Sequence, residues 1–93
     1  MEITGKMIKM LPEVMGETSR GTWVRSGFVV EVGDDYPKKV CFTCIGEDKI
    51  AMAKKIPEGS MVMVSFQPES REYNGKWYTE LKCSSVKELV VRG

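Results

Sequence analysis

The sequence predicts an all-β fold: a small five-stranded Greek-key barrel with one short helix between the third and fourth strands. Segments rich in β-branched and aromatic residues recur along the 93 residues. A single stretch with helical spacing of apolar residues follows the third of these segments. An Asn-Gly pair, a strong local signal for a tight hairpin turn, joins the last two. A chain of this length forms one domain, which we expect to span residues 1–93.

Three predicted strands precede the helix. Residues 3–11 form the first, and Gly5 within it indicates the bulge or sharp bend that a small barrel needs. Residues 13–21 are polar, and we expect a mobile loop there. In residues 22–32 the even positions are mostly apolar and the odd positions mostly polar, which predicts one buried face and one wet face. Residues 38–45 are β-branched and aromatic, and form the third strand.

The predicted helix covers residues 49–56. Acidic residues precede it, lysines lie near its end, and apolar residues recur at helical spacing. Residues 57–59 (Pro-Glu-Gly) end the helix, and residues 61–67 and 77–86 form the fourth and fifth strands. This order of elements is that of an oligonucleotide/oligosaccharide-binding (OB) fold. SH3-like barrels, the alternative, lack such a helix.

The turn at Asn74-Gly75 predicts the two faces of the last hairpin, because a type I′ turn requires positive φ at both residues. The pairs that follow by counting outward are Tyr73 with Lys76, Glu72 with Trp77, and Arg71 with Tyr78. One face holds the predicted core residues Val62, Val64, Phe66, Leu81 and Cys83, with Trp77 above them near the tip. The opposite face holds Arg71, Tyr73, Lys76, Tyr78 and Lys82, with Glu69 and Glu80 nearer the base.

Two tyrosines among cations on a solvent-facing ribbon have three interpretations. In the first, the rings stack on unpaired bases while Arg71, Lys76 and Lys82 contact phosphates. In the second, aromatic residues simply favour strands, and the charges keep an exposed hairpin soluble. In the third, the tyrosines are buried against another subunit, so that the chain is a self-assembling protein-interaction module. The first interpretation is our main prediction, with single-stranded nucleic acid as the partner.

The composition argues against an enzyme. The chain has no histidine, so an ordinary Ser-His or Cys-His pair cannot form, and no glycine-rich phosphate loop precedes the helix. We expect no catalytic residues, no cofactor and no small-molecule substrate. The net charge is only +1, so an anion-binding surface must arise from the arrangement of charges. No apolar run reaches the ~18 residues that span a bilayer. The start of the chain does not resemble a signal peptide, so we expect a cytoplasmic protein with no membrane partner.

Cys41 and Cys44 form a C-x-x-C pattern, which suggests zinc binding or redox chemistry. The residues around them are typical of a strand, in which positions i and i+3 point to opposite faces. Cys83 is the only other cysteine, and the odd count fits an intracellular protein with free thiols. We therefore predict no metal site, and thiols that act as small packing residues.

Three stretches resemble bacterial single-stranded-DNA-binding proteins, namely residues 46–51 (GEDKIA), 56–65 (IPEGSMVMVS) and 73–81 (YNGKWYTEL). This resemblance extends from about residue 38 to residue 86. A second resemblance, over nearly the whole chain, is to a bacterial family of small single-domain proteins that are similar in sequence to these and have no assigned role. Its motifs are residues 1–6 (MEITGK), 36–40 (YPKKV) and 69–78 (ESREYNGKWY). The resemblance to single-stranded-DNA-binding proteins implies an OB fold and single-stranded nucleic-acid binding without sequence specificity, with DNA as the expected ligand.

The resemblance also implies a binding surface on the exposed side of strands two and three and on the adjoining loops. Carried over to this sequence, and with Lys82 added from the hairpin pattern, the surface comprises Trp23, Arg25, Lys39, Arg71, Tyr73, Lys76, Tyr78 and Lys82. Trp23 lies at a wet-face position beside Arg25, which suits a stacking platform with a phosphate partner. Alternatively, Trp23 covers the loop at residues 13–21 as a satellite of the core.

Two features of the sequence depart from the pattern of those relatives. The carboxylates Glu69, Glu72 and Glu80 lie in or beside the proposed groove and argue against strong affinity for DNA. The relatives usually end in a flexible acidic tail that docks partner enzymes, whereas this sequence ends in the short basic residues 90–93. We therefore do not expect recruitment of enzymes through such a tail.

Overall fold

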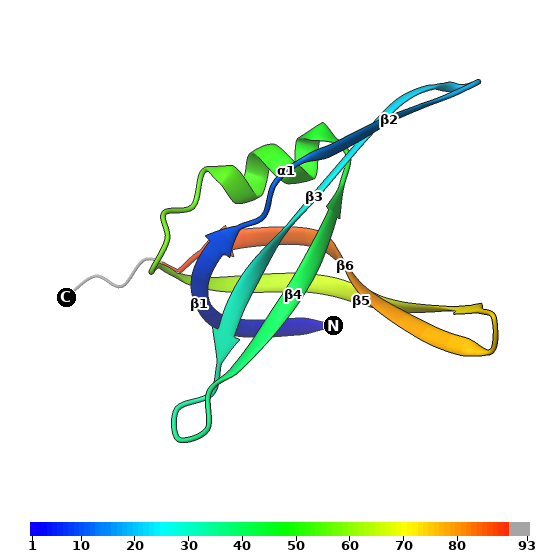
Figure 1. Cartoon of the computed structure of the whole chain (residues 1–93). Helices are drawn as coiled ribbons and strands as arrows, with labels where there is room; N and C mark the ends of the chain where they lie inside the picture. Colours follow the sequence, from blue (N-terminus) through cyan, green and yellow to red (C-terminus); the bar gives the residue numbers. More distant parts are fainter. Residues whose placement is uncertain (90–93) are drawn as a thin grey trace.

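The computed structural model describes residues 1–89 and consists of one sheet and one helix (Figure 1). The elements are β1 (Glu2–Met10), β2 (Val14–Thr18), β3 (Gly21–Val32), β4 (Lys38–Ile45), α1 (Glu47–Lys54), β5 (Met61–Tyr73) and β6 (Lys76–Glu88). The prediction of a mostly-β fold with one short helix is confirmed. The basic end of the sequence, residues 90–93, lies outside the described residues.

The sheet has six strands in the order β1-β5-β6-β4-β3-β2, so the prediction of five strands was wrong. β1 pairs with β5 through residues 2–6 and with β3 through residues 6–10, which links five of the strands into a ring and leaves β2 outside it. A Cβ on Gly5, where β1 passes from one partner to the other, would lie 2.5 Å from the Glu31 carbonyl oxygen. Gly5 thus permits a close approach of two strands. The register shift itself lies further on, between Met7 and Lys9.

The sixth strand, β2, lies where we expected a mobile loop. It pairs with the start of β3, from Val14 opposite Arg25 to Thr18 opposite Gly21. The turn between the two strands is held by the Thr18 hydroxyl, which accepts from the Arg20 amide and donates to the Gly21 carbonyl oxygen, both at 3.2 Å. At the other end, an ion pair between Glu13 and Lys54 ties the residues before β2 to α1. Contacts distant in sequence therefore order this polar segment.

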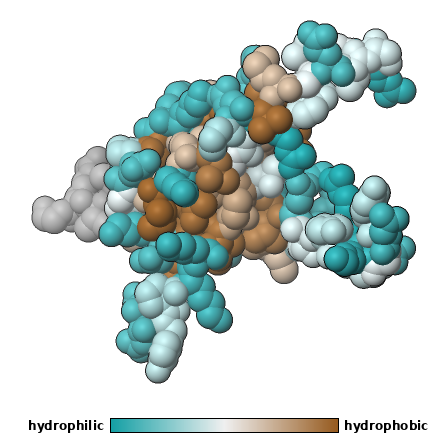
Figure 2. Space-filling view, in the orientation of Figure 1, coloured by the Kyte–Doolittle hydropathy of each residue, from teal (hydrophilic) through white to brown (hydrophobic). Residues whose placement is uncertain are grey.

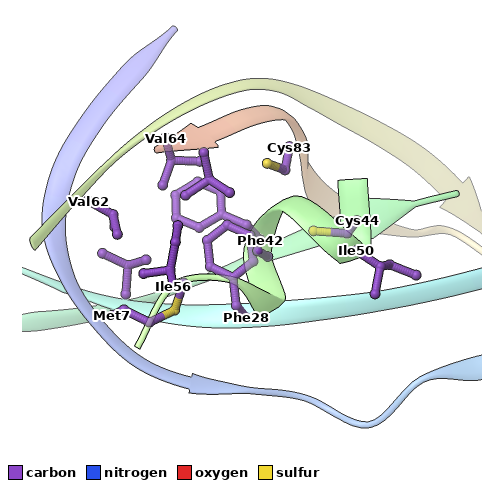
Figure 3. Close-up of a cluster of buried hydrophobic side chains, with 12 residues drawn as sticks. Met7, Phe28, Phe42, Cys44, Ile50, Ile56, Val62, Val64 and Cys83 are labelled. Carbon is purple, nitrogen blue, oxygen red and sulfur yellow. The ribbon is translucent and has the colours of Figure 1, made fainter. Parts of the chain in front are cut away.

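The core lies inside the ring of strands and under α1 (Figure 3). Phe42 packs between Phe28 and Phe66, with ring centroids 5.4 and 5.2 Å away. The helix contributes Ile50 and Ala53, which are both buried. The other buried apolar residues are Met7, Val30, Cys44, Ile56, Val62, Val64, Cys83 and Val86. The alternation predicted for β3 is confirmed, because its even positions from 26 to 30 are buried. Within residues 1–89, no helix is long and apolar enough to cross a membrane.

The hairpin of β5 and β6 has the predicted register, with Tyr73 opposite Lys76, Glu72 opposite Trp77 and Arg71 opposite Tyr78. Its turn has the predicted geometry, since φ is 51° at Asn74 and 80° at Gly75. The hairpin projects beyond the core, and its tip is hydrophilic, like the tips of the other two hairpins (Figures 1 and 2). Trp77 near this tip is 68% exposed, so the face that carries the core at its base is open to solvent at its end.

Candidate nucleic-acid interface

One continuous surface, here called the outer face, connects β3 and β4 with the hairpin. It consists of the solvent side of β3 and β4 and the hairpin side that carries Tyr78, Glu80 and Lys82. Two contacts join these parts. Thr43 of β4 pairs with Lys82 of β6, and Arg25 of β3 forms an ion pair with Glu80 of β6. The structure therefore brings side chains from both halves of the sequence into one place.

Charged groups occupy the centre of the outer face. Arg25 donates to Oε1 of Glu80, and Arg71 donates to Oε2 of the same carboxylate at 3.3 Å. Lys82 forms a second ion pair with Glu69, with Nζ and Oε2 2.9 Å apart. Three of the predicted phosphate-binding cations are thus already engaged with carboxylates. The sequence had indicated acidic residues near the groove, but it did not show which cations they pair with.

Glu80 is the most enclosed member of this cluster, with a side chain that is only 24% exposed. The hydrogen bond from Arg25 holds the pKa of Glu80 below its ordinary value, against burial, which raises it. The positive charges of Arg25, Arg71 and Lys82 lower it further. Glu80 is consequently a carboxylate at neutral pH and bridges β3 to the hairpin.

Aromatic rings lie on both sides of the charged cluster. Trp23 is two residues from Arg25 along β3 and is 41% exposed, while Tyr78 is two residues from Glu80 along β6 and is 52% exposed. The alternative interpretation, in which Trp23 covers residues 13–21, holds in part. Its indole covers Gly16 of β2, where a Cβ would lie 2.2 Å from Cζ2, and much of its surface still faces solvent.

The other three predicted residues lie away from this centre. Tyr73 and Lys76 form the last pair before the turn, and Tyr73 is 66% exposed. Lys39 pairs with Glu31, six residues along β3 from Arg25 and so about 20 Å away by strand rise. In the described part of the chain, neither Lys39 nor Lys76 forms an ion pair. The eight predicted residues thus form a central group of five with three outliers.

Two hollows in the outer face were not predicted. The first, of about 190 Å³, lies over Gly27 and is bounded by Val14, Arg25, Cys41 and Thr43. Gly27 is buried, and a Cβ there would lie 2.6 Å from the Phe42 carbonyl oxygen. Glycine is therefore needed for the close approach of β3 and β4. This glycine in the middle of an alternating strand was the one sequence signal for the hollow.

The second hollow lies at the junction of β4 and β6 and measures about 340 Å³. Ile45 and Thr43 border it on β4, and Lys82 borders it on β6. Lys49 of α1 also lines it and adds a cation that the sequence-based prediction missed. Ile45 is 45% exposed and supplies an apolar surface beside these two lysines.

The cysteines confirm the predicted divergence of the C-x-x-C pair. Cys41 is exposed on the outer face, whereas Cys44 points into the core beside Cys83 (Figure 3). A hydrogen bond with Cys83 and burial both raise the pKa of the Cys44 thiol. Residues 1–89 contain no group of three or more His, Cys, Asp or Glu side chains arranged to hold a metal ion.

Solved structures with a similar fold include two that are named as single-stranded-DNA-binding proteins, the family that the sequence resembles. The mitochondrial single-stranded-DNA-binding protein Rim1 of S. cerevisiae is 12% identical, with 96% of this chain and 92% of that chain covered and a TM-score of 0.72. The N-terminal domain of PriB from Thermoanaerobacter tencongensis, a dimeric structure, is 16% identical, with coverages of 98% and 96% and a TM-score of 0.63. The small single-stranded-DNA-binding protein of Streptomyces coelicolor is 13% identical, with coverages of 100% and 95% and a TM-score of 0.53.

At these identities the likeness establishes the fold, which is OB-like. No curated protein matches the chain by sequence. A family profile does match, over residues 2–87, and is described as a domain of unknown function, DUF3127. The match spans most of the 93 residues, so the chain belongs to the DUF3127 family.

Proposed function

We propose that the chain binds single-stranded nucleic acid, DNA in the first instance, without sequence specificity and through the outer face. The observation that carries this proposal is the spatial order of aromatic and charged side chains across that face. From β3 to β6, the side chains come in the order Trp23, Arg25, Glu80 and Tyr78. Exposed rings therefore flank the charged cluster. In this proposal residues 1–93 form one OB domain, and the ring of five strands is a Greek-key barrel with β2 added to its edge.

This arrangement suits a flexible, unpaired strand. Aromatic rings stack on any base, because every base has a π-face, and each well-stacked base contributes about 1–3 kcal/mol. Arginine and lysine side chains between the rings would contact the phosphates that separate the stacked bases. None of these contacts reads a base edge, so the binding tolerates any sequence. The mechanism has no covalent step and needs no catalytic group.

The comparisons support the proposal at the level of the fold. Two of the similar structures, from S. cerevisiae and Streptomyces coelicolor, are named as single-stranded-DNA-binding proteins. The specific support comes from this chain's own residues. The sheet places Trp23 and Tyr78 on one surface although they are distant in sequence, and that surface also carries Arg25, Arg71 and Lys82.

Titration of a fluorescent oligo-dT at two salt concentrations tests the proposal. We expect binding at ~50 mM salt and release well below molar salt, with a log–log slope near −0.7 for each neutralised phosphate. Duplex DNA of the same length is the matched competitor, and it should bind more weakly because its bases are not free to stack. A lack of oligo-dT binding at tens of micromolar protein in ~50 mM salt would contradict the proposal.

A second candidate function is self-assembly through the hairpin. The tip carries exposed rings on both faces, with Trp77 on one and Tyr73 and Tyr78 on the other. Exposed aromatic surface of this kind is typical of protein interfaces. The mass of the protein in solution distinguishes the two candidates. A stable oligomer that Trp77→Ala dissociates, with no binding of oligo-dT, would favour assembly over nucleic-acid binding.

A further inference from the structure

Two guanidinium groups from different strands converge on one anion position in the outer face. Arg25 of β3 and Arg71 of β5 each direct an Nη2 atom at a different oxygen of the Glu80 carboxylate. The position is partly enclosed, since the Glu80 side chain is 24% exposed. The structure thus contains a built anion site, filled by a side chain of the same chain.

A phosphodiester group fits the same position. Like a carboxylate, it carries one negative charge and presents two oxygens in a plane, which guanidinium groups bind through paired hydrogen bonds. The flanking rings of Trp23 and Tyr78 lie where the bases on either side of such a phosphate would stack. Glu80 and a backbone phosphate would therefore compete for Arg25 and Arg71.

Glu80 lies in an electrostatically unfavourable position, and a bound ligand could release it from there. It pairs directly across the hairpin with Glu69, and like charges in opposed positions destabilise a β-ribbon. Cations offset this repulsion, with Arg25 and Arg71 on Glu80 and Lys82 on Glu69. A phosphate that replaces Glu80 leaves the carboxylate free to turn into solvent, away from Glu69.

We propose that Glu80 is an internal stand-in for a nucleic-acid phosphate. Its carboxylate occupies the Arg25–Arg71 site in the free protein, and a phosphodiester of the bound strand displaces it. This inference rests on the proposed function and deepens it. Glu80 is a positioning residue, since it holds both arginines in place before the strand arrives. Its charge lowers the affinity of the site for a backbone phosphate. It also excludes anions that bind the two arginines more weakly than Glu80 does.

Oligo-dT titrations of Glu80→Gln and the wild type test the inference. Glutamine keeps the shape of the side chain and removes its charge, so we expect binding to strengthen by about three- to tenfold at low salt. The salt dependence should also steepen, by up to about 0.7 for the one phosphate at this site, because in the variant the phosphate pairs with the arginines without breaking an ion pair inside the protein. A merely structural role of Glu80 would not steepen the slope. Thermal unfolding followed by circular dichroism confirms that the variant is folded.

Glu72→Gln is the matched control. It makes the same charge change on the same hairpin, but on the opposite face, where Glu72 pairs with Trp77. We expect it to change the affinity much less than Glu80→Gln does. A second control compares Arg25→Gln/Arg71→Gln with and without Glu80→Gln, where the gain from Glu80→Gln should disappear.

The outcomes separate the inference from the function on which it rests. Measurable binding by the wild type, together with tighter binding and a steeper slope in Glu80→Gln alone, supports the inference. If the wild type binds and Glu80→Gln binds equally or less well, or if Glu72→Gln gains as much, the inference fails and the proposed function stands. If no variant binds, both fail.

Discussion

The indole of Trp23 lies directly against the backbone of Gly16, so close that a Cβ on Gly16 would be 2.2 Å from Cζ2. Gly16 is the residue opposite Trp23 in the β2–β3 pairing. The ring therefore has a flat seat on β2, and its orientation depends on a residue that carries no side chain. In the proposed function this seat holds Trp23 ready to stack on a base.

Gly16→Ala should weaken oligo-dT binding through Trp23. The added methyl group cannot coexist with the indole in its present position, so the ring must move, with a loss of stability on the order of 1–2 kcal/mol. Intrinsic fluorescence in a Trp77→Phe background would report the displacement of Trp23. If Gly16→Ala weakens binding equally in a Trp23→Ala background, the effect does not pass through the indole.

Removal of either outer-face ring should weaken nucleic-acid binding. Trp23→Ala and Tyr78→Ala each delete one stacking platform, and we expect each to cost about 1–3 kcal/mol of binding free energy. Oligo-dT titration gives the affinity. Trp77→Ala is the matched control, because it removes an exposed ring from the opposite face of the same hairpin. An equal loss in Trp77→Ala would contradict the assignment of the binding surface.

Cys41 should be protected from alkylation by a bound oligonucleotide. It is the exposed cysteine of the three, and it borders the hollow over Gly27 on the outer face. A maleimide should modify it in the folded protein, while the buried Cys44 and Cys83 react only on unfolding and serve as internal controls. Mass spectrometry should show slower modification of Cys41 with saturating oligo-dT. An unchanged rate would place the bound strand elsewhere.

The contribution of Glu80 to stability should depend on pH. Its pKa is lower in the folded protein than the ordinary value of 4.5, so the carboxylate stabilises the fold above pH 4.5. This contribution is lost as the pH falls below 4.5 and through the folded-state pKa. Urea unfolding of the wild type and Glu80→Gln should differ by on the order of 1 kcal/mol at neutral pH. A difference that stays constant down to pH 2 would show that the charge of Glu80 does not stabilise the fold.

The sequence predicted best where local chemistry decides the structure. Asn74-Gly75 can adopt two consecutive positive φ angles, so the register of a long hairpin followed from the turn alone. The alternation in residues 22–32 predicted correctly which side of β3 is buried. The opposed orientation of Cys41 and Cys44 followed from strand geometry in the same way.

The errors and omissions concern contacts between distant segments. β2 is polar in sequence and becomes a strand because it pairs with β3, seats Trp23 and is tied to α1 through Glu13 and Lys54. The pairing of Glu80 with Arg25 joins residues 55 positions apart, which no local pattern reveals. Lys39 shares the outer face with Arg25, but the length of β3 separates the two.

The junction of β4 and β6 has one further consequence. Thr43 and Lys82 are the single residue pair that joins these strands in the described structure, whereas the other junctions of the ring are longer. Because so few backbone hydrogen bonds join the two strands, this junction can open locally while the rest of the sheet stays intact. Its amide hydrogens should exchange with solvent sooner than those of the β3–β4 pairing. A nucleotide strand that contacts both β4 and β6 would hold the junction closed. The amides whose exchange slows on binding would then show where the strand lies on the protein.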